Sequence, residues 1–454
     1  MNYRMIAYLL GYLILIEAAF MILPLLVALI YAETSGIWFL AAVLFSAVLG
    51  FGLTRLKPVK RNMYAKEGFV ITALAWIVIS LIGAAPFSLS GQIPNYLDAV
   101  FEMVSGFTTT GASLVPNVEE LDYCMNFWRC LSHWLGGMGI LVFMLAIVNL
   151  GGGQSNHLLR AESPGPSVSK MMPSMRKSSA TLYTIYMVMT LVEIILLLLG
   201  DMPLYDSICH AFGTAGTGGF GINFNVYFFL TVRKWSAAIR NTEVWAYLGI
   251  IAVSVLFITL NIVEMFPSLF EALHHAFFTV SSVITTTGFA TVDFNLWPEL
   301  SRLILVFLMI VGACAGSTGG GVKVSRFVIL CKATAFEIRK LLHPRSVKVL
   351  TMDGKPIGKE TIQGVQSYMM VYFLITVISI LLVSLDNYDM VTTITAVEAT
   401  LNNIGPGLNM VGPSGNYAFF SPLSKIVLTL DMLFGRLELF PMLILLSPST
   451  WRKY

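Results

Sequence analysis

The stretch Thr285-Thr286-Thr287-Gly288 decides the fold, because it is one of four short polar turns that each follow an apolar segment too short to cross a bilayer. Irregular backbone persists at membrane depth only where protein buries it or water reaches it. A ring of carbonyl oxygens that replaces the hydration shell of a cation meets both conditions. The turns therefore predict a selectivity filter made by a single chain. The other three turns are Thr108-Thr109-Thr110-Gly111, Ala215-Gly216-Thr217-Gly218 and Asn402-Asn403-Ile404-Gly405.

The composition indicates a polytopic membrane protein. Of the 454 residues, 56% are hydrophobic and 12% are charged, whereas about 25% are charged in soluble domains. The first apolar run, Ile6–Ile30, is longer than a signal-peptide core, so we expect it to be retained. The net charge of +3 gives no indication of nucleic-acid binding. The five cysteines do not form a metal-type pair in the sequence.

The placement of charge predicts the topology. Most of the 28 Lys and Arg residues lie in four connecting segments, whereas the segments that carry the turns contain acidic residues instead. The positive-inside bias then places the basic segments and both chain ends in the cytoplasm, and we expect a multi-pass protein of the bacterial cytoplasmic membrane. The four basic segments are Arg55–Lys66, Arg160–Lys177, Arg233–Arg240 and Lys323–Lys359.

Nine apolar segments are each long enough to cross about 30 Å of hydrocarbon as helices. They lie near Ile6–Ile30, Ile37–Leu53, Phe69–Leu89, Phe127–Leu150, Leu182–Leu199, Trp245–Met265, Leu303–Ile329, Gln366–Leu385 and Ile426–Leu446.

Four shorter, semi-apolar segments have the length of half-membrane helices. Each precedes one turn, so its carbonyl end would point toward the pore centre and favour a cation there. The repeating unit is therefore helix, pore helix, filter turn, helix. The predicted fold is an all-α membrane protein with four such pseudo-repeats around one central pore and two additional N-terminal helices. The half-helices are Asn95–Phe107, Leu204–Thr214, Leu269–Ile284 and Met390–Leu401.

The predicted boundaries follow from this repeat. Residues 1–60 contain the two N-terminal helices, 61–160 the first repeat, 161–240 the second, 241–345 the third with a glycine-rich loop, and 346–454 the fourth.

The second repeat is short on its outgoing side. The apolar stretch Ile222–Val232 would rise only about 16 Å as a helix, roughly half a bilayer. One explanation is a helix that starts at filter depth and drops directly to the basic segment beginning at Arg233. The alternative, which we favour, is that a segment has been lost.

The four turns together resemble the Trk/Ktr/HKT superfamily of potassium transporters, and most closely its Trk-type pore subunits. The resemblance covers essentially the whole chain and rests on the motifs starting at Ser105, Gly213, Thr285 and Asn402. Glycine allows the left-handed angles that turn successive carbonyls toward one axis, although single turns of this composition can also be ordinary loop punctuation. The resemblance implies potassium-binding filter positions at Thr109, Thr110, Gly111, Thr217, Gly218, Thr286, Thr287, Gly288, Asn403, Ile404 and Gly405.

A glycine-rich stretch, Gly312–Gly321, interrupts the seventh apolar segment. A phosphate-binding loop would end in Gly-Lys-Ser/Thr before a soluble helix, and this one does not. A tolerated helix break and a flexible plug under the filter remain as interpretations, and the resemblance implies the plug. The resemblance also implies that Arg436 faces the cavity below the filter; the alternative is a structural ion pair with Asp431 or Glu438. The expected gating residues are Gly316, Ser317, Thr318, Gly319, Gly320 and Arg436.

The resemblance implies potassium uptake, with K⁺ as the transported ion and no organic cofactor. It also implies a homodimer whose cytoplasmic face docks a ring of nucleotide-binding regulatory subunits. The basic segment Lys323–Lys359 would serve that contact or touch anionic lipids. The sequence leaves open a symporter of potassium coupled to H⁺ or Na⁺, and a transport-defective truncated member. A membrane enzyme would need clustered acidic or histidine side chains, which the sequence does not indicate.

Overall fold

The computed structural model describes residues 1–58, 65–139, 175–217, 241–315, 317, 319–343 and 350–451. Within these residues the secondary structure is helical apart from one short antiparallel pair, β1 (Thr351–Met352) and β2 (Lys355–Pro356). The described residues form two compact units. Unit 1 holds those up to Thr217 together with Asn416–Trp451, and unit 2 holds those from Asn241 to Gly415.

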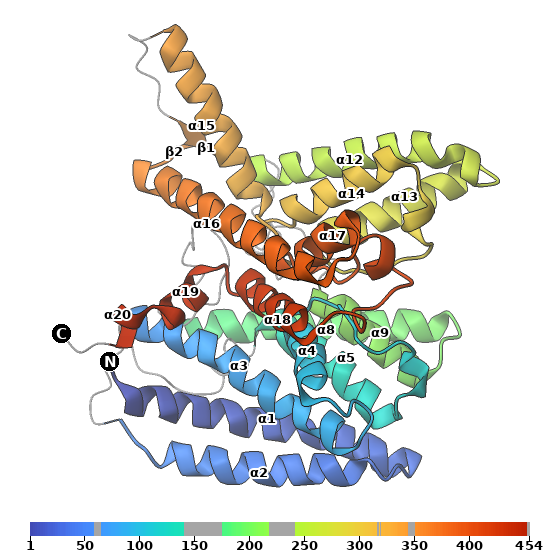
Figure 1. Cartoon of the computed structure of the whole chain (residues 1–454), viewed down its shortest axis with the longest axis vertical. Helices are drawn as coiled ribbons and strands as arrows, with labels where there is room; N and C mark the ends of the chain where they lie inside the picture. The colour runs from blue at the N-terminus through green and yellow to red at the C-terminus, as the bar shows by residue number, and fades with distance from the viewer. Residues whose placement is uncertain are drawn as a thin grey trace. The chain divides into compact units, whose positions relative to one another are not determined.

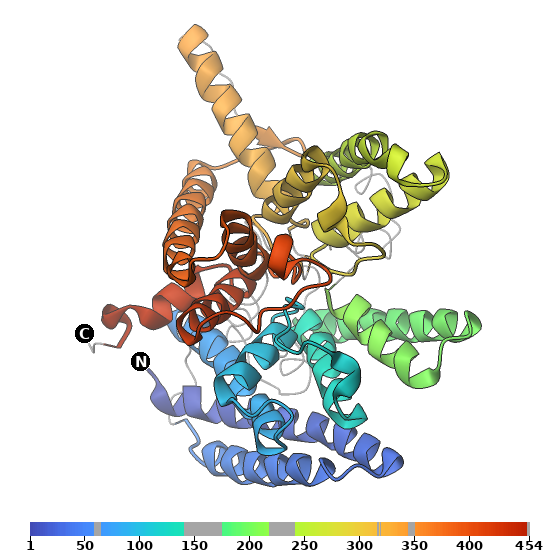
Figure 2. The same ribbon diagram turned by 45° about the vertical axis from the view of Figure 1, so that its right-hand side comes forward.

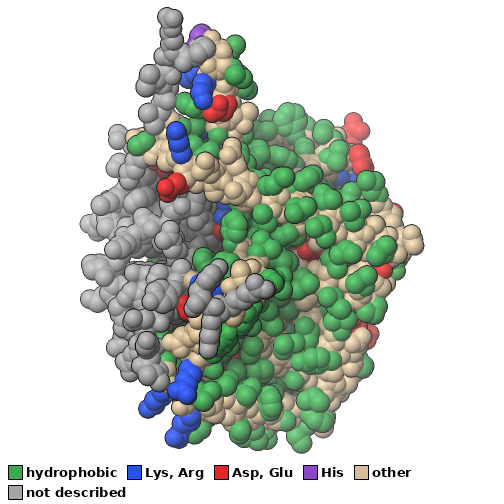
Figure 3. All heavy atoms as spheres, turned by 60° about the vertical axis from the view of Figure 1, so that its left-hand side comes forward, with side chains coloured by type: hydrophobic (Ala, Val, Ile, Leu, Met, Phe, Trp, Pro, Cys, Tyr) green, Lys and Arg blue, Asp and Glu red, His purple; other side chains and the backbone are tan. Residues whose placement is uncertain are grey.

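Five of the described helices are long and apolar enough to span a membrane. On the face shown in Figure 3, hydrophobic side chains cover most of the described surface, as expected for helices surrounded by lipid. The chain is therefore an all-α polytopic membrane protein, as predicted. The five helices are α1 (Tyr3–Tyr31), α2 (Gly36–Thr54), α3 (Ala65–Leu89), α12 (Thr242–Ile262) and α16 (Lys359–Val383).

Unit 1 begins with α1 and α2, which lie side by side (Figure 1). A Cβ added to Gly11 would lie 2.9 Å from the carbonyl oxygen of Gly50, so the missing side chains allow the two backbones to approach closely. The unit also contains the half-helix α4 (Tyr96–Phe107), against which α18 packs. Its other helices are η1 (Val118–Glu120), α5 (Tyr123–Met138), α8 (Met175–Leu199), α9 (Leu204–Thr217), α18 (Pro422–Arg436), α19 (Phe440–Leu446) and α20 (Pro448–Trp451).

Unit 2 is built around the half-helices α13 (Leu269–Ile284) and α17 (Met390–Leu401). Its helix α15 (Val324–Leu342) extends away from the others (Figures 1 and 2). The remaining elements are η2 (Val263–Met265), η3 (Phe294–Leu296), α14 (Glu299–Val311), η4 (Ser384–Asp386) and η5 (Asn409–Val411).

The four half-helices have the predicted positions and 12 to 16 residues each. At 1.5 Å per residue they rise only about 18 to 24 Å, less than the hydrocarbon thickness. Three of them begin at a polar residue whose side chain accepts from a backbone N–H of the first turn, namely Asn95, Ser268 and Asp389. These caps fix the N-terminal end of three half-helices, and the carbonyl end of each leads into its turn.

Unit 1 has a different set of contacts at each end of its helices. At one end Tyr3 stacks on Trp451, with ring centroids 6.3 Å apart, and Lys66 Nζ donates to the carbonyl of Ser449 at 3.2 Å. At the other end Glu33 accepts from the backbone N–H groups of Tyr123 and Cys124. Tyr3 and Trp451, near the two chain ends, therefore lie at the same end of unit 1 as Lys66 of the basic segment Arg55–Lys66.

The last predicted span, Ile426–Leu446, is not one helix. The helix α18 ends at Arg436, Glu438 and Leu439 adopt left-handed backbone angles with φ of 55° and 65°, and α19 begins at Phe440. Pro441 stands in the first turn of α19, where its missing N–H is tolerated. In a continuous helix the same proline would clash with the preceding turn, so the chain breaks before it.

Three further sequence predictions concern the glycine-rich loop, the basic segment that follows it and the short stretch of the second repeat. The seventh apolar segment is interrupted by the glycine-rich loop, as expected, since α14 ends at Val311 and α15 begins at Val324. Lys323 and Arg326 are buried, which corrects the expectation that they belong to a cytoplasmic surface. The short stretch Ile222–Val232 lies outside the described residues.

Candidate functional site

Three of the four predicted filter turns follow the same backbone path. In each, the residue two positions before the glycine adopts a left-handed conformation, and so does the glycine itself. The residue between them does not, so residues with positive and negative φ alternate along each turn. The φ angles are 57°, 59° and 53° at Thr109, Thr286 and Asn403, and 81°, 81° and 93° at Gly111, Gly288 and Gly405.

The hydrogen bonds of these turns are also equivalent. The backbone N–H groups of Thr110, Thr287 and Ile404 each donate to the carbonyl five residues earlier, at 2.9, 2.8 and 2.9 Å. Each turn is thus an extension of its half-helix, closed by the type of bond that caps helix C-termini. The half-helix therefore determines where the turn lies.

The first residue of each turn holds the helix end, a role that sequence reasoning missed. Side-chain atoms of Thr108, Thr285 and Asn402 donate to the carbonyl four residues earlier, at 2.6, 2.6 and 2.8 Å. In two turns the hydroxyl also pairs with that of the third residue, Thr110 or Thr287, at 2.7 and 2.8 Å. The sequence signal for this role was a hydroxyl or amide side chain three positions before the glycine in each of these three turns.

The second turn differs from its prediction. The half-helix α9 continues through Ala215 and Gly216 to Thr217, so these residues are helical, and Gly218 lies outside the described residues. Ala215 occupies the position of Thr108, Thr285 and Asn402. It has no side-chain donor that competes for a helix carbonyl, and alanine is the best helix former.

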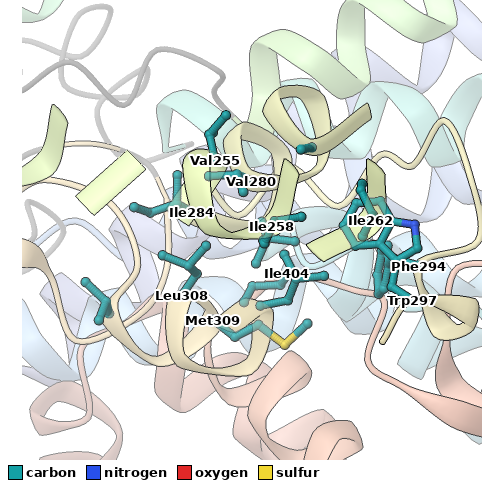
Figure 4. Close-up of a cluster of buried hydrophobic side chains, with 14 of the residues drawn as sticks. Val255, Ile258, Ile262, Val280, Ile284, Phe294, Trp297, Leu308, Met309 and Ile404 are labelled. Carbon is teal, nitrogen blue, oxygen red and sulfur yellow. The ribbon is translucent and has the colours of Figure 1, made fainter. Parts of the chain in front are cut away.

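The third and fourth turns lie against each other in unit 2. A Cβ on Gly288 would overlap the carbonyl oxygen of Ile404. The side chain of Ile404 points away into the unit's hydrophobic core, together with Ile284, Leu308 and Met309 (Figure 4). Burial of this side chain anchors the fourth turn, while its backbone stays close to the third.

The glycine-rich loop packs against the same two turns. The backbone N–H of Gly320 donates to Thr286 Oγ1 at 2.9 Å, and a Cβ on Gly320 would overlap the carbonyl of Asn402. A Cβ on Gly319 would lie 3.0 Å from the carbonyl of Thr285. Only residues without a side chain fit here. The structure thus brings Gly319 and Gly320 to the filter turns, whereas Ser317 bonds within the loop to the carbonyl of Cys314, and Gly316 and Thr318 lie outside the described residues.

Arg436 lies at the C-terminal end of α18 in unit 1. Its Nη2 donates to the carbonyls of Gly136 at 2.5 Å and Gly137 at 3.2 Å, and its guanidinium lies 5.3 Å from the ring centroid of Trp76. Carbonyls at the end of α5 carry the negative end of a helix dipole, which stabilises the positive charge. Arg436 belongs to unit 1, and the glycine-rich loop belongs to unit 2.

A buried carboxylate supports the fourth turn from behind. Glu398 accepts hydrogen bonds from Tyr372 Oη at 2.9 Å and from Asn402 Nδ2 at 2.8 Å. Tyr372 Oη also lies 3.1 Å from Asn402 Oδ1. The network links helix α16, the half-helix α17 and the turn.

These features define a helical membrane protein in which half-membrane helices end in left-handed glycine turns. The family model TrkH, described as a cation transport protein, matches residues 32–226 and 227–453. The chain belongs to this family.

Relatives of known function align along the whole chain. The Trk system potassium uptake protein TrkH of Salmonella typhimurium is 34% identical over 488 aligned positions, covering 100% of both chains. TrkG of Escherichia coli, also a Trk system potassium uptake protein, is 31% identical over 99% of both chains. The crystal structure of the potassium transporter TrkH from Vibrio parahaemolyticus matches with a TM-score of 0.87 and 30% identity over 100% of both chains.

Proposed function

We propose that this chain takes up potassium through a pore lined by backbone carbonyls of its four glycine turns. The observation that carries the proposal is the shared backbone path of three turns, with the same alternation of left-handed residues and the same capping bonds. A cation at the carbonyl ends of several half-helices would be stabilised by both the carbonyls and the helix dipoles. The relatives named as potassium uptake proteins make K⁺ the expected ion.

The packing within each unit supports one ring of repeats. In unit 1, α5 of the first repeat packs against α9 of the second, and α18 of the fourth packs against α4 of the first. In unit 2, the third and fourth turns touch. We infer that the fourth repeat closes the ring onto the first, with Thr217 and Gly218 completing the filter.

The glycine-rich loop would act as the gate. Since it donates to Thr286 and lies against Asn402, it would obstruct the path beneath the filter until it moves. Arg436 would add a positive charge below the filter and raise the barrier for cations. We further propose a homodimer with a nucleotide-binding regulatory partner on the cytoplasmic face of a bacterial inner membrane, where both termini would lie.

The direct test is ion flux in liposomes that contain the purified chain. An imposed K⁺ gradient should drive K⁺ movement that a matched Na⁺ gradient does not reproduce. K⁺ movement that follows the K⁺ gradient alone would support a channel, whereas movement driven by an imposed H⁺ or Na⁺ gradient would support the symporter. Absence of K⁺ flux from well-folded protein under all gradients would contradict the proposal.

Partners can be tested separately by pull-down from membranes with and without nucleotide. Recovery of a soluble nucleotide-binding protein would support the regulatory ring. Its absence under every nucleotide condition, together with binding of the protein's basic segment to anionic vesicles, would favour a lipid role.

A transport-defective member is the second candidate, because the family match consists of two pieces that meet between residues 226 and 227. That junction falls within the short stretch Ile222–Val232. The alignment with the Salmonella relative has 488 positions for the 454 residues of this chain, so 34 positions have no counterpart here. The position of the junction favours the loss of a segment after Gly218, and the 34 unmatched positions are enough to contain such a segment.

A further inference from the structure

Two buried charged residues lie beside the glycine-rich loop and have no place in the filter. Glu243, in the first turn of α12, is 3% exposed, and Lys323, at the end of the loop, is 2% exposed. Burying a charge is unfavourable unless it is well paired. The hydrogen bonds of these two side chains therefore indicate their role.

Glu243 joins the first half of the loop to the helix that follows it. One carboxylate oxygen, Oε1, accepts from the backbone N–H of Ala315 at 2.6 Å and from that of Ser325 at 3.1 Å. Ala315 lies in the first half of the loop, and Ser325 lies in the first turn of α15. A single atom of another helix thus closes the base of the loop, through charge-assisted hydrogen bonds that are stronger than neutral ones.

Lys323 binds the loop from its inner side. Its Nζ donates to the carbonyl of Gly319 and, at 3.4 Å, to the carbonyl of Ser317. The backbone of Lys323 is left-handed, with φ of 79°, which turns the chain back along the loop. The next residue after Gly319 is Gly320, whose N–H is bound to Thr286. The lysine therefore holds the segment that touches the filter turn.

We propose that Glu243 and Lys323 are positioning residues that hold the loop in its blocking conformation. This inference rests on the proposed gating function. For the loop to withdraw from Thr286 and Asn402, its backbone must give up the hydrogen bonds to both charges. Loss of either side chain should therefore favour the open loop without altering the filter itself.

The same helix turn is attached to the β1–β2 hairpin. The backbone N–H of Thr242, the neighbour of Glu243, donates to Asp353 Oδ1 at 2.7 Å. Asp353 and Gly354 form the hairpin's turn with φ of 52° and 75°, and Lys332 of α15 donates to the carbonyl of Thr351 at 3.2 Å. A displacement of the hairpin would thus reach both Glu243 and the helix that follows the loop.

The test compares K⁺ flux in liposomes for K323M, K323R, E243A and E243Q. K323M and E243A should raise basal flux about 10-fold, as expected for the loss of charge-assisted hydrogen bonds from one state only. Arginine at 323 keeps the donors and should restore low flux, and glutamine at 243 keeps an acceptor and should have a smaller effect than alanine. The controls are E264Q, just beyond the other end of α12, and K340M, at the far end of α15, which remove exposed charges and should leave flux unchanged.

A second measurement does not depend on transport. A cysteine introduced as S317C, in a chain whose five native cysteines are replaced, reports the exposure of the loop by its rate of labelling with a membrane-impermeant thiol reagent. K323M and E243A should accelerate labelling from the cytoplasmic side, whereas K323R and the two controls should not.

The two readouts separate the inference from the proposed function. Faster labelling in a chain that never conducts K⁺ would support the positioning role and contradict the proposed transport. K⁺ flux and labelling rates that both stay unchanged in K323M would overturn the positioning role and leave transport intact. If E243A fails to fold, K323M and its rescue by K323R decide the question alone.

Discussion

Gly288 lies against the carbonyl oxygen of Ile404 so closely that a Cβ on the glycine would overlap it. Two turns separated by more than a hundred residues therefore share one backbone contact. This contact allows the third and fourth turns to lie side by side in unit 2, and it leaves no room for a side chain at Gly288.

We expect G288A to lower both stability and K⁺ flux. An L-residue at a φ of 81° is strained by about 1–2 kcal/mol, and the collision with Ile404 adds to this. Flux should fall at least about tenfold, since the turn must move to relieve the collision. The control is G249A in the middle of α12, where a Cβ meets nothing within 4 Å. Thermal unfolding in detergent and liposome flux measure both effects, and a fully active, equally stable G288A would contradict the packing argument.

At the first turn we expect G111S to reduce discrimination against sodium. The added side chain would shift carbonyls that replace the hydration shell of the ion. G91S is a matched control, because Gly91 has a similar φ of 79° but no neighbour within 4 Å of an added Cβ. The measurement is the ratio of K⁺ to Na⁺ flux, together with growth of a potassium-uptake-deficient host on micromolar potassium. Equal K⁺-to-Na⁺ flux ratios in G111S and G91S would show that backbone strain at a positive φ, and not a change in the filter, causes the loss of discrimination.

Removal of the gate should raise basal flux. Deletion of Gly316–Gly320 shortens the loop that touches Thr286 and Asn402, and R436A removes a positive charge near the end of α5. R302A serves as the control, since Arg302 pairs with Glu299 and contacts Asn409 in unit 2. Variants that reach the membrane with unchanged or lower flux would argue against both gating assignments.

Restoring the second repeat should restore or strengthen transport. Insertion of about 20 apolar residues between Phe220 and Ile222 adds about 30 Å of helix, which gives the outgoing segment enough length to span the bilayer. A polar insertion of equal length is the control, because it cannot enter the hydrocarbon. Labelling of cysteines at Thr231–Arg240 should come from the cytoplasmic side in either form. Strong potassium uptake by the unaltered chain would refute the argument that a necessary segment is missing.

The half-helices and three of the four turns were predictable because their signals are local. A half-helix such as α13 ends at Ile284, as predicted, since an apolar run of limited length stops at a repeated hydroxyl and glycine. The break after Arg436 was missed because Leu437–Leu446 is apolar apart from Glu438, and apolar content alone does not distinguish a continuous helix from two short ones. Pro441 was the local signal that could have revealed it.

The support of the loop could not be predicted from the sequence. Glu243 and Lys323 lie far apart along the chain, and each resembles an ordinary charge at the edge of a membrane helix. Only the fold brings the carboxylate to Ala315 and Ser325. The continuation of α9 through Ala215 was also missed. The glycines at 216 and 218 suggested a turn, but Ala215 has no side-chain donor that competes for a helix carbonyl, and the absence of such a donor favours helix.

The common backbone path of Thr109–Gly111, Thr286–Gly288 and Asn403–Gly405 has a consequence for how such a pore can be altered. Every amino acid contributes a backbone carbonyl, so no side-chain substitution can remove an ion ligand from the proposed filter. A substitution can only change the direction in which a carbonyl points. Mutational responses should therefore be graded and not all-or-none. Weakening a single ligand without changing any side chain would require chemical replacement of one peptide bond by an ester, whose carbonyl oxygen is a poorer cation ligand.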